Sequence, residues 1–207
     1  MTMSFPRFGG AMSRLARGAV LVAAVALAGC STKPAPQQSY PELTYGHYGV
    51  INLDVARIEF TNSYVPPLRD PNVEHRAPAN PSVVMERWTR DRLRAVGTTG
   101  EARVVLRDAK IIENRLAVQG GVQGMFNTDQ GFRYDASMQV EIQIRDNAGV
   151  QRAFTTVQAA RSKTAAENVT LAEKDKVLFD LVEATMTEIN GELEKNIRQY
   201  LGPYVRP

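Results

Sequence analysis

Few side chains of this 207-residue chain are of types that do covalent or metal chemistry. It has one cysteine, Cys30, and two histidines, His47 and His75, which stand far apart in the sequence. A zinc site needs several Cys or His ligands at close spacing, and no such group is present. The chain also lacks the G-x-S-x-G turn of serine hydrolases and the glycine-rich loops that bind phosphates after a strand. We therefore predict no enzyme, no cofactor and no metal site.

Carboxylates offer the remaining route to catalysis. A hydrolase would require Asp108, Glu113 and Asp135 to converge in one pocket, since acid–base work needs paired groups within reach of a substrate. The alternating pattern around Asp135 places that side chain on the solvent face of a strand. A hydrolase is therefore the third and least favoured of the functional hypotheses for this chain.

Cys30 follows a segment with the features of an export signal. Arginines at positions 7, 14 and 17, with no acidic residue, precede an apolar run of mainly Ala, Val and Leu at 18–28. That run is too short to span a bilayer, which needs about 20 residues. The start is Met1 or Met12, and either choice leaves the same apolar run. The pattern predicts a signal peptide over residues 1–29.

The residues before the cysteine specify the kind of signal. Leu27-Ala28-Gly29-Cys30 resembles the lipobox of bacterial lipoproteins, which implies that Cys30 carries acyl chains such as palmitate and becomes the mature amino terminus. Ser31 follows, and the absence of Asp there implies the outer membrane, by resemblance to Gram-negative sorting rules. The expected location is the outer membrane, with a lipid anchor and a domain facing the periplasm.

Charge excludes one class of partner. The chain has 25 Lys and Arg against 22 Asp and Glu, but three arginines and no acid precede Cys30. From Cys30 onward the two signs are therefore equal in number. A neutral chain has no general attraction to a phosphate backbone, so nucleic acid is not an expected partner.

The chain from Cys30 onward has the size of one domain. Residues 30–46 are rich in Pro, Gln and Ser and lack apolar periodicity, which predicts a flexible tether. Residues 47–207 are predicted to form a single domain.

The first half of this domain predicts a strand over 48–60, a long loop over 61–79 and a helix. The alternation of apolar and polar residues shifts by one position within the strand near Ala56, which indicates a bulge or bend. The helix begins with Asn80 as cap and Pro81 at its first position, and it is expected to end at Gly97. A further strand runs over 102–116 with a bend near Asp108.

The second half contains the clearest patterns. Apolar and polar residues alternate strictly over 132–145, which is typical of a strand with one buried and one wet face. A turn at 146–149 leads into a strand over 150–160, giving an antiparallel hairpin. Thr170 and Glu173 form a capping-box pattern before a helix over 171–201, whose apolar residues recur at intervals of three and four.

These elements predict an α+β fold of two layers. The order β-α-β-β-β-α gives a four-stranded, mostly antiparallel sheet with two helices on one face, because the apolar helix stripe and the apolar sheet face must bury each other.

The stretch from Asn80 to Leu201 resembles the LPS-assembly lipoprotein family (LptE-like). The resemblance comes from the lipobox, the helix that runs into Gly97, the alternation at Tyr134, Ala136, Met138 and Val140, the pair Arg161-Ser162, Asn168 and an acidic start to the last helix. It implies a non-enzymatic scaffold or accessory subunit of an envelope assembly, with LPS export as one such assembly. Auxiliary lipoproteins of ABC-type lipid transporters share this layout and are the alternative; a hydrophobic cleft between sheet and helices would favour them.

Partner contacts are expected at basic and aromatic side chains. Arg145 and Arg152 flank the predicted turn, and Arg161 and Lys163 end the following strand, so together they could bind the phosphates of LPS or a phospholipid. Phe126, in a polar glycine-rich loop, is a candidate contact with a protein partner or the membrane. The alternative for the four cations is a solvated strand face of mixed charge.

Overall fold

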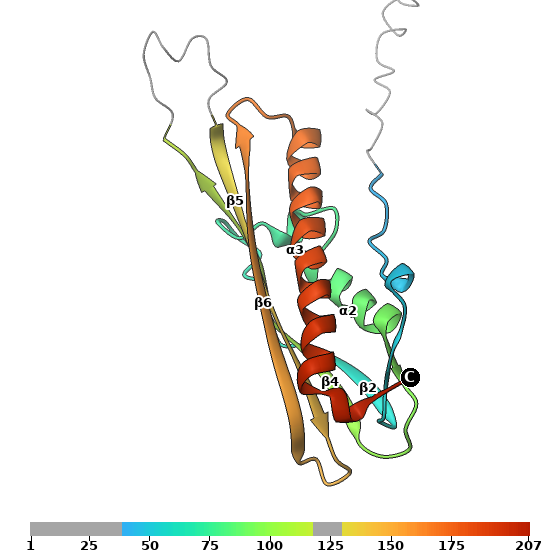
Figure 1. Ribbon diagram of the computed structural model, residues 1–207. Coiled ribbons are helices and arrows are strands. Elements are labelled where there is room, and N and C mark those ends of the chain that lie inside the picture. Colours follow the sequence, from blue (N-terminus) through green and yellow to red (C-terminus); the bar gives the residue numbers. More distant parts are fainter. Residues whose placement is uncertain (1–38, 118–129) are drawn as a thin grey trace, which may run out of the picture. The chain divides into compact units, whose positions relative to one another are not determined.

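The computed structural model describes residues 39–117 and 130–207 (Figure 1). Its main sheet has the strand order β2-β4-β5-β6, with β2 parallel to β4 and the other neighbours antiparallel. The strands are β2 (Arg57–Asn62), β4 (Glu101–Arg115), β5 (Gln130–Arg145) and β6 (Gln151–Ala166). The helices are α2 (Pro81–Arg92) and α3 (Leu171–Tyr200).

The predicted α+β class and the four-stranded sheet are confirmed. A second, small sheet was not predicted. It has the order β3-β1-β7 and consists of β1 (Ile51–Leu53), β3 (Leu93–Ala95) and β7 (Val205–Arg206). Three short 3-10 turns, η1 (Gly46–Tyr48), η2 (Glu74–Arg76) and η3 (Gly202–Tyr204), complete the elements of the described ranges.

The strand predicted over 48–60 is two strands in different sheets. The change of parity near Ala56 lies at the break between them, where the Ala56 N–H donates to the carbonyls of Thr99 and Gly100, each at 3.1 Å. β1 before the break pairs with β3, and β2 after it pairs with β4. The predicted irregularity is confirmed, and its consequence is a change of sheet and not a bulge.

Helix α2 begins as predicted and ends earlier. The Asn80 side chain accepts from the Ser82 N–H at 2.9 Å, and Pro81 is the first helical residue. The helix ends at Arg92, because Leu93–Ala95 become extended and pair with Ile51–Leu53. Gly97 is therefore no helix cap. A side chain there would place its Cβ 2.6 Å from the carbonyl carbon of Asp54, so glycine allows a close approach of two loops.

Strands β4 and β5 follow their patterns. The predicted bend in β4 is a register shift between Leu106 and Asp108. The even-numbered residues of β5 from Phe132 to Ile144 are buried and the odd-numbered ones are not, so the predicted alternation is confirmed. The strand after the turn is longer than predicted, since β6 continues to Ala166.

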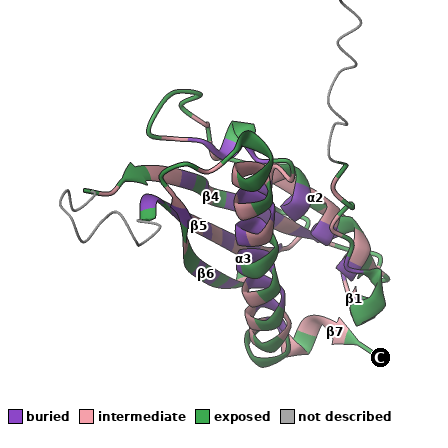
Figure 2. Ribbon diagram, turned by 90° about the horizontal axis from the view of Figure 1, so that it is seen from above, coloured by how far each residue is buried: buried purple, intermediate pink, exposed green. Residues whose placement is uncertain are grey.

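Helix α3 closes the core. Its capping box is formed by both reciprocal bonds between Thr170 and Glu173. The helix packs along β6 and β5, and α2 packs against β4 beside it, so that buried side chains meet between the two layers (Figure 2). The Trp88 indole N–H donates to the Asn190 amide oxygen at 2.9 Å and joins the two helices inside this core.

Residues 39–46, which fall within the predicted tether, lie against the helices. The Tyr40 ring stacks on Phe179 with ring centroids 5.0 Å apart, and Glu42 pairs with Arg87 at 2.6 Å. The backbone N–H of Tyr45 donates to Asp91 at 2.8 Å. This part of the predicted tether is therefore attached to the domain, since aromatic and charged side chains at 40–45 find partners on α2 and α3.

Candidate functional site

The four cations proposed from the sequence lie in two separate places. Register pairs Arg161 with Ala136 and Lys163 with Tyr134, so both cations lie on the face of β6 that α3 covers. There Arg161 pairs with Glu188 at 2.9 Å and Lys163 with Asp180 at 2.8 Å. These two cations hold β6 to α3 and are already neutralised.

Asp180 shows how complete this neutralisation is. Its carboxylate accepts from Lys163 at 2.8 Å and from Lys176 at 2.9 Å. Partial burial acts to raise the pKa of Asp180, and the two lysine hydrogen bonds outweigh it and hold the pKa below the ordinary value. The carboxylate is therefore ionised at neutral pH, and Lys163 has a permanent partner within the protein.

The other two cations, Arg145 and Arg152, line a pocket of about 470 Å³ at the end of the sheet that holds the β5–β6 turn. Segments distant in sequence build its walls: the link between β1 and β2, the loop before β4, the turn itself and the chain around β7. The last of these brings in a third guanidinium, Arg206. Sequence reasoning missed Arg206 because nothing local indicates that the carboxyl-terminal strand pairs with β1.

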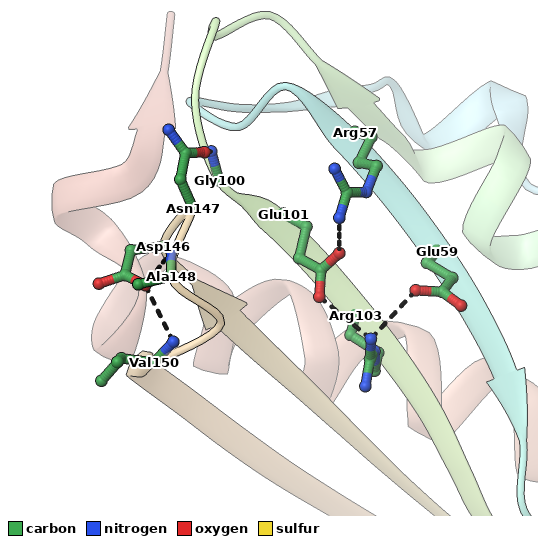
Figure 3. A network of polar contacts seen from close by, with 9 residues as sticks. All are labelled: Arg57, Glu59, Gly100, Glu101, Arg103, Asp146, Asn147, Ala148 and Val150. Carbon is green, nitrogen blue, oxygen red and sulfur yellow. Dashed lines mark hydrogen bonds and ion pairs between the residues drawn. The ribbon is translucent and has the colours of Figure 1, made fainter.

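A compact turn shapes the pocket. The Asp146 carboxylate accepts from the N–H groups of Ala148 at 3.0 Å and Val150 at 2.9 Å, while the Asn147 side chain accepts from the Gly100 N–H at 2.7 Å (Figure 3). The hydrogen bond from the Val150 N–H, together with Arg152, keeps the pKa of Asp146 below its ordinary value. The turn is thus joined to the loop before β4 and holds its shape.

Gly100 is required for this junction. Its φ is +72°, in the left-handed region, and an added Cβ would lie 2.5 Å from the carbonyl oxygen of Arg145. Glycine alone adopts this backbone conformation without steric cost. The backbone of Arg145 is therefore approached more closely than any other residue type would allow.

Charges around the pocket are balanced except at Arg145. Arg152 pairs with Asp146 at 2.5 Å, and Arg206 pairs with Asp54. Beside them, on the sheet face turned away from the helices, Glu101 binds Arg57 at 2.5 Å and Arg103 at 3.1 Å, and Arg103 reaches Glu59 at 3.3 Å (Figure 3).

Arg145 lies next to this row of charges without joining it. Register places it directly across from Glu101, yet among residues 39–117 and 130–207 no carboxylate comes within 4.0 Å of its guanidinium. Its Nε is buried and has no hydrogen-bond partner in that part of the chain. The excess positive charge of this corner therefore resides on Arg145. The pocket can hold an anionic group by charge-assisted hydrogen bonds.

A second hollow bears on the lipid-binding alternative. The centre of the helix–sheet interface is filled, with Leu106, Ile142 and Ile189 fully buried. At the margin, between α2 and β2, lies a groove of about 400 Å³ with Ile58, Phe60 and Leu93 among its lining residues. The apolar space between the layers is thus at the edge of the interface and not in its middle.

The three carboxylates of the hydrolase hypothesis do not converge. Asp135 pairs across the sheet with Ile112 on the face away from the helices, where it binds Asn114, Arg133 and Ser162. Glu113 lies on the helix face, 3.9 Å from Lys174 of α3. Asp108 accepts from Ser137 at 2.9 Å and pairs with Lys110. Each carboxylate is occupied separately by a neighbouring side chain.

Three further findings concern the described ranges or their limits. Within residues 39–117 and 130–207, no three His, Cys, Asp or Glu side chains are grouped as metal ligands would be. Neither helix there has the length together with the apolar character needed to cross a membrane. Cys30 and Phe126, two of the residues proposed from the sequence, lie outside the described residues.

Comparison with known proteins gave structural likenesses alone. Neither a protein-family model nor a curated protein sequence matches the chain. The rare lipoprotein B from Shewanella oneidensis is similar with a TM-score of 0.33 and 11% identity, over 69% of this chain and 98% of that one. A minor lipoprotein from Acinetobacter baumannii has a TM-score of 0.29 and 15% identity, over 68% and 94%.

A third solved structure, a PelC dodecamer from Paraburkholderia phytofirmans, has a TM-score of 0.22 and 11% identity, over 73% of this chain and 92% of that one. All three likenesses are structural, at 11–15% identity, and none assigns a role to this chain. They concern the fold alone.

Proposed function

We propose that this chain is a non-enzymatic lipoprotein of the bacterial outer membrane, anchored through acylated Cys30, whose domain faces the periplasm and serves as a scaffold or accessory subunit of an envelope assembly. The lipobox Leu27-Ala28-Gly29-Cys30 carries this proposal. It explains why an exported chain has a single cysteine, which cannot form a disulfide within the chain. Several acyl chains, at about 0.8 kcal/mol per buried CH₂, make a durable anchor.

The domain supports a scaffolding role. Its core is filled between two layers, and ion pairs such as Arg161–Glu188 join β6 to α3. A filled core with such links between its layers gives a rigid body that presents fixed surfaces to a protein partner. Arg145, in the pocket by the β5–β6 turn, is a cation with capacity left for an anionic group of that partner or of LPS.

Lipidation is tested in cells of a Gram-negative host. We expect the wild-type chain to fractionate with the outer membrane and to carry acyl mass on Cys30 by mass spectrometry, and Cys30→Ala to remain a larger, unprocessed precursor. A matched variant, Ser31→Asp, should keep its acyl mass and move to the inner-membrane fraction. A wild-type protein with an unmodified cysteine would refute the anchor.

LPS export is the assembly to test first. We expect Arg145→Glu to weaken binding of lipid A by about tenfold, because one charge-assisted hydrogen bond is replaced by repulsion. Arg69→Glu is the matched control, since Arg69 is exposed on a loop that does not line the pocket. Equal binding by wild type and Arg145→Glu would remove LPS from the proposal and leave the scaffold role.

The groove between α2 and β2 favours a second candidate function, a lipid-binding auxiliary lipoprotein of an ABC-type lipid transporter. Its volume of about 400 Å³ falls within the range of small-molecule sites. The two functions separate in a pull-down of the acylated protein from detergent-solubilised envelope. Co-purification of an outer-membrane protein supports the first, and of an ATP-binding transporter subunit the second.

A further inference from the structure

The groove between α2 and β2 has an apolar floor that the fold leaves partly open. Register pairs Ile58 and Phe60 with Ala102 and Val104, which are 0% exposed, so all four side chains lie on the helix face of the sheet. Ile58 and Phe60 are nevertheless only half-buried, because they lie on the edge strand of the sheet. Their exposed parts line the groove.

Across the groove from Ile58 and Phe60, the residues next to the floor add no polar group that lacks a hydrogen-bond partner. Leu93 is 6% exposed and turns into the groove where α2 gives way to β3, and Ala95 follows on the same strand. Thr89 also lines the groove, but its hydroxyl donates to the Met85 carbonyl within the helix at 3.0 Å. The floor is therefore a surface for alkyl groups.

Charged residues surround this floor, and one of them is unpaired. Arg90 pairs with Glu86 one helical turn earlier, at 2.8 Å. Arg94 is exposed, and within the part of the chain that the structure describes it has neither an ion pair nor a side-chain hydrogen bond. With two arginines and one glutamate, the rim carries an excess positive charge that is located at Arg94.

From this combination we infer that the groove binds a single-chain amphiphile with an anionic head, such as a fatty acid or an alkyl phosphate. The alkyl chain lies on Ile58, Phe60, Leu93 and Ala95, and the head group accepts hydrogen bonds from Arg94. The inference deepens the second candidate function by naming the ligand class. It does not depend on the acylation of Cys30.

Volume limits the length of the chain. If a methylene occupies about the 30 Å³ that a water molecule takes in the liquid, a groove of about 400 Å³ holds roughly a dozen carbons and one head group. This volume matches one alkyl chain of that length. Affinity should rise roughly three- to fourfold for each added CH₂ up to that length and then level off.

The test uses the full chain with Cys30→Ala, so that no acyl group of the protein competes for the groove. Isothermal titration compares decanoate, decyl phosphate, decyltrimethylammonium and decyl maltoside, which share one chain length. We expect the two anions to bind at least about tenfold tighter than the cation, since Arg94 attracts the former and repels the latter. Chains from eight to sixteen carbons then test the expected plateau.

Two variants locate the site. Arg94→Glu should reduce decanoate affinity about tenfold and leave decyl maltoside unchanged, because the exposed head contact is lost and the floor is kept. Ala95→Leu, which fills part of the floor, should weaken all four ligands. Arg69→Glu carries the same charge change outside the groove and should bind decanoate as the parent does.

Several outcomes would overturn the inference. Equal affinities for anion and cation, an equal loss in Arg94→Glu and Arg69→Glu, or no binding of decanoate by the folded parent would each do so. Because this experiment uses a chain without the anchor, a negative result leaves the membrane attachment untouched, and failure of acylation leaves the groove untouched.

Discussion

At the scale of residues, buried polar side chains hold the two helices in one alignment. Arg92, which is 1% exposed, donates to Glu194 of α3 at 2.6 Å and to the carbonyl of Gly49. Trp88 and Asn190 form a second link in the core. A buried donor without a partner costs more than a paired one contributes, so these contacts discriminate against other alignments of α2 and α3.

The Arg92–Glu194 pair leads to an asymmetric prediction. Glu194→Leu leaves a buried guanidinium without its carboxylate and should lower the free energy of unfolding by about 3 kcal/mol. Arg92→Met should cost less, because the Glu194 side chain is 32% exposed and keeps Arg198 as a partner at 3.0 Å. Urea denaturation measures both. A larger loss of stability in Arg92→Met than in Glu194→Leu would show that burial of the remaining charge does not determine the cost of breaking this pair.

The same glutamate makes stability depend on pH. The hydrogen bond from Arg198, with the nearby Arg92 charge, keeps the pKa of Glu194 below its ordinary value of 4.5 in the folded state. The stabilisation is therefore fully present above pH 4.5 and is lost as pH falls through the lowered pKa.

Glu194→Gln should accordingly reduce the fall in unfolding free energy between pH 6 and pH 3 relative to wild type. Urea titrations of both proteins at several pH values measure this difference. Glu192→Gln is the matched control, because Glu192 is more exposed and pairs with Lys195 at 3.5 Å. Identical pH slopes for wild type and Glu194→Gln would contradict the assignment.

At the scale of elements, close backbone approaches decide where strands begin and end. The turn at 146–149 contacts the loop before β4 through the Asn147–Gly100 hydrogen bond, and this contact forms one side of the arginine-lined pocket. Both Gly100 and Gly149 have positive φ values, +72° and +78°. Only Gly100 has another backbone against it.

These two glycines form a matched pair for a prediction. Gly149→Ala should cost about 1 kcal/mol, the penalty for a left-handed conformation with open space around the new Cβ. Gly100→Ala should cost at least about 2 kcal/mol, because its Cβ also meets the Arg145 carbonyl. Thermal unfolding compares them. Equal costs would mean that the loop moves aside freely.

At the scale of the whole molecule, β5 is the centre of the fold. It pairs with β4 on one side and β6 on the other over nearly its full length, and α3 packs across β5 and β6. β6 is an edge of the sheet, so alternate backbone groups along it have no strand partner. Stability should therefore be highest in β5 and fall toward β6.

Native-state hydrogen exchange tests this gradient. We expect the amides of β5 between Phe132 and Ile144 to exchange only through global unfolding, and every second amide of β6 to exchange faster by orders of magnitude. The three-residue strand β1, in the small sheet, should open independently of β5. Equal protection of the amides in both sheets would contradict the predicted gradient of stability.

Local patterns allow much of this fold to be predicted. The alternation over 132–145 specifies a strand and its buried face without knowledge of its neighbours, because side chains in any strand point alternately to two sides. The capping box at Thr170 and Glu173 likewise satisfies backbone donors within its own helix. The bend near Asp108 and the turn at 146–149 are equally local.

The candidate site can be predicted only in part. The position of Arg145 and Arg152 beside the turn predicts that they lie together, and they do line one pocket. Arg161 and Lys163 are expected beside them but lie elsewhere, because they pair with Glu188 and Asp180 of α3. No local pattern reveals these partners. The same holds for Arg206 and for the groove beside Arg94, both formed by segments remote in sequence.

Local sequence patterns specify the order of the long elements β4, β5, β6 and α3 and their buried faces, since each of these depends on residues within a few positions of one another. Three other features follow from long-range contacts: the first strand divides between two sheets, α2 ends at Arg92, and Arg145 remains unpaired. Those outcomes depend on pairing between β1, β3 and β7 and on charges brought together by folding. Residues remote in sequence determine whether a short segment is stable as a strand or as a helix, and the sequence of the segment itself gives no sign of them.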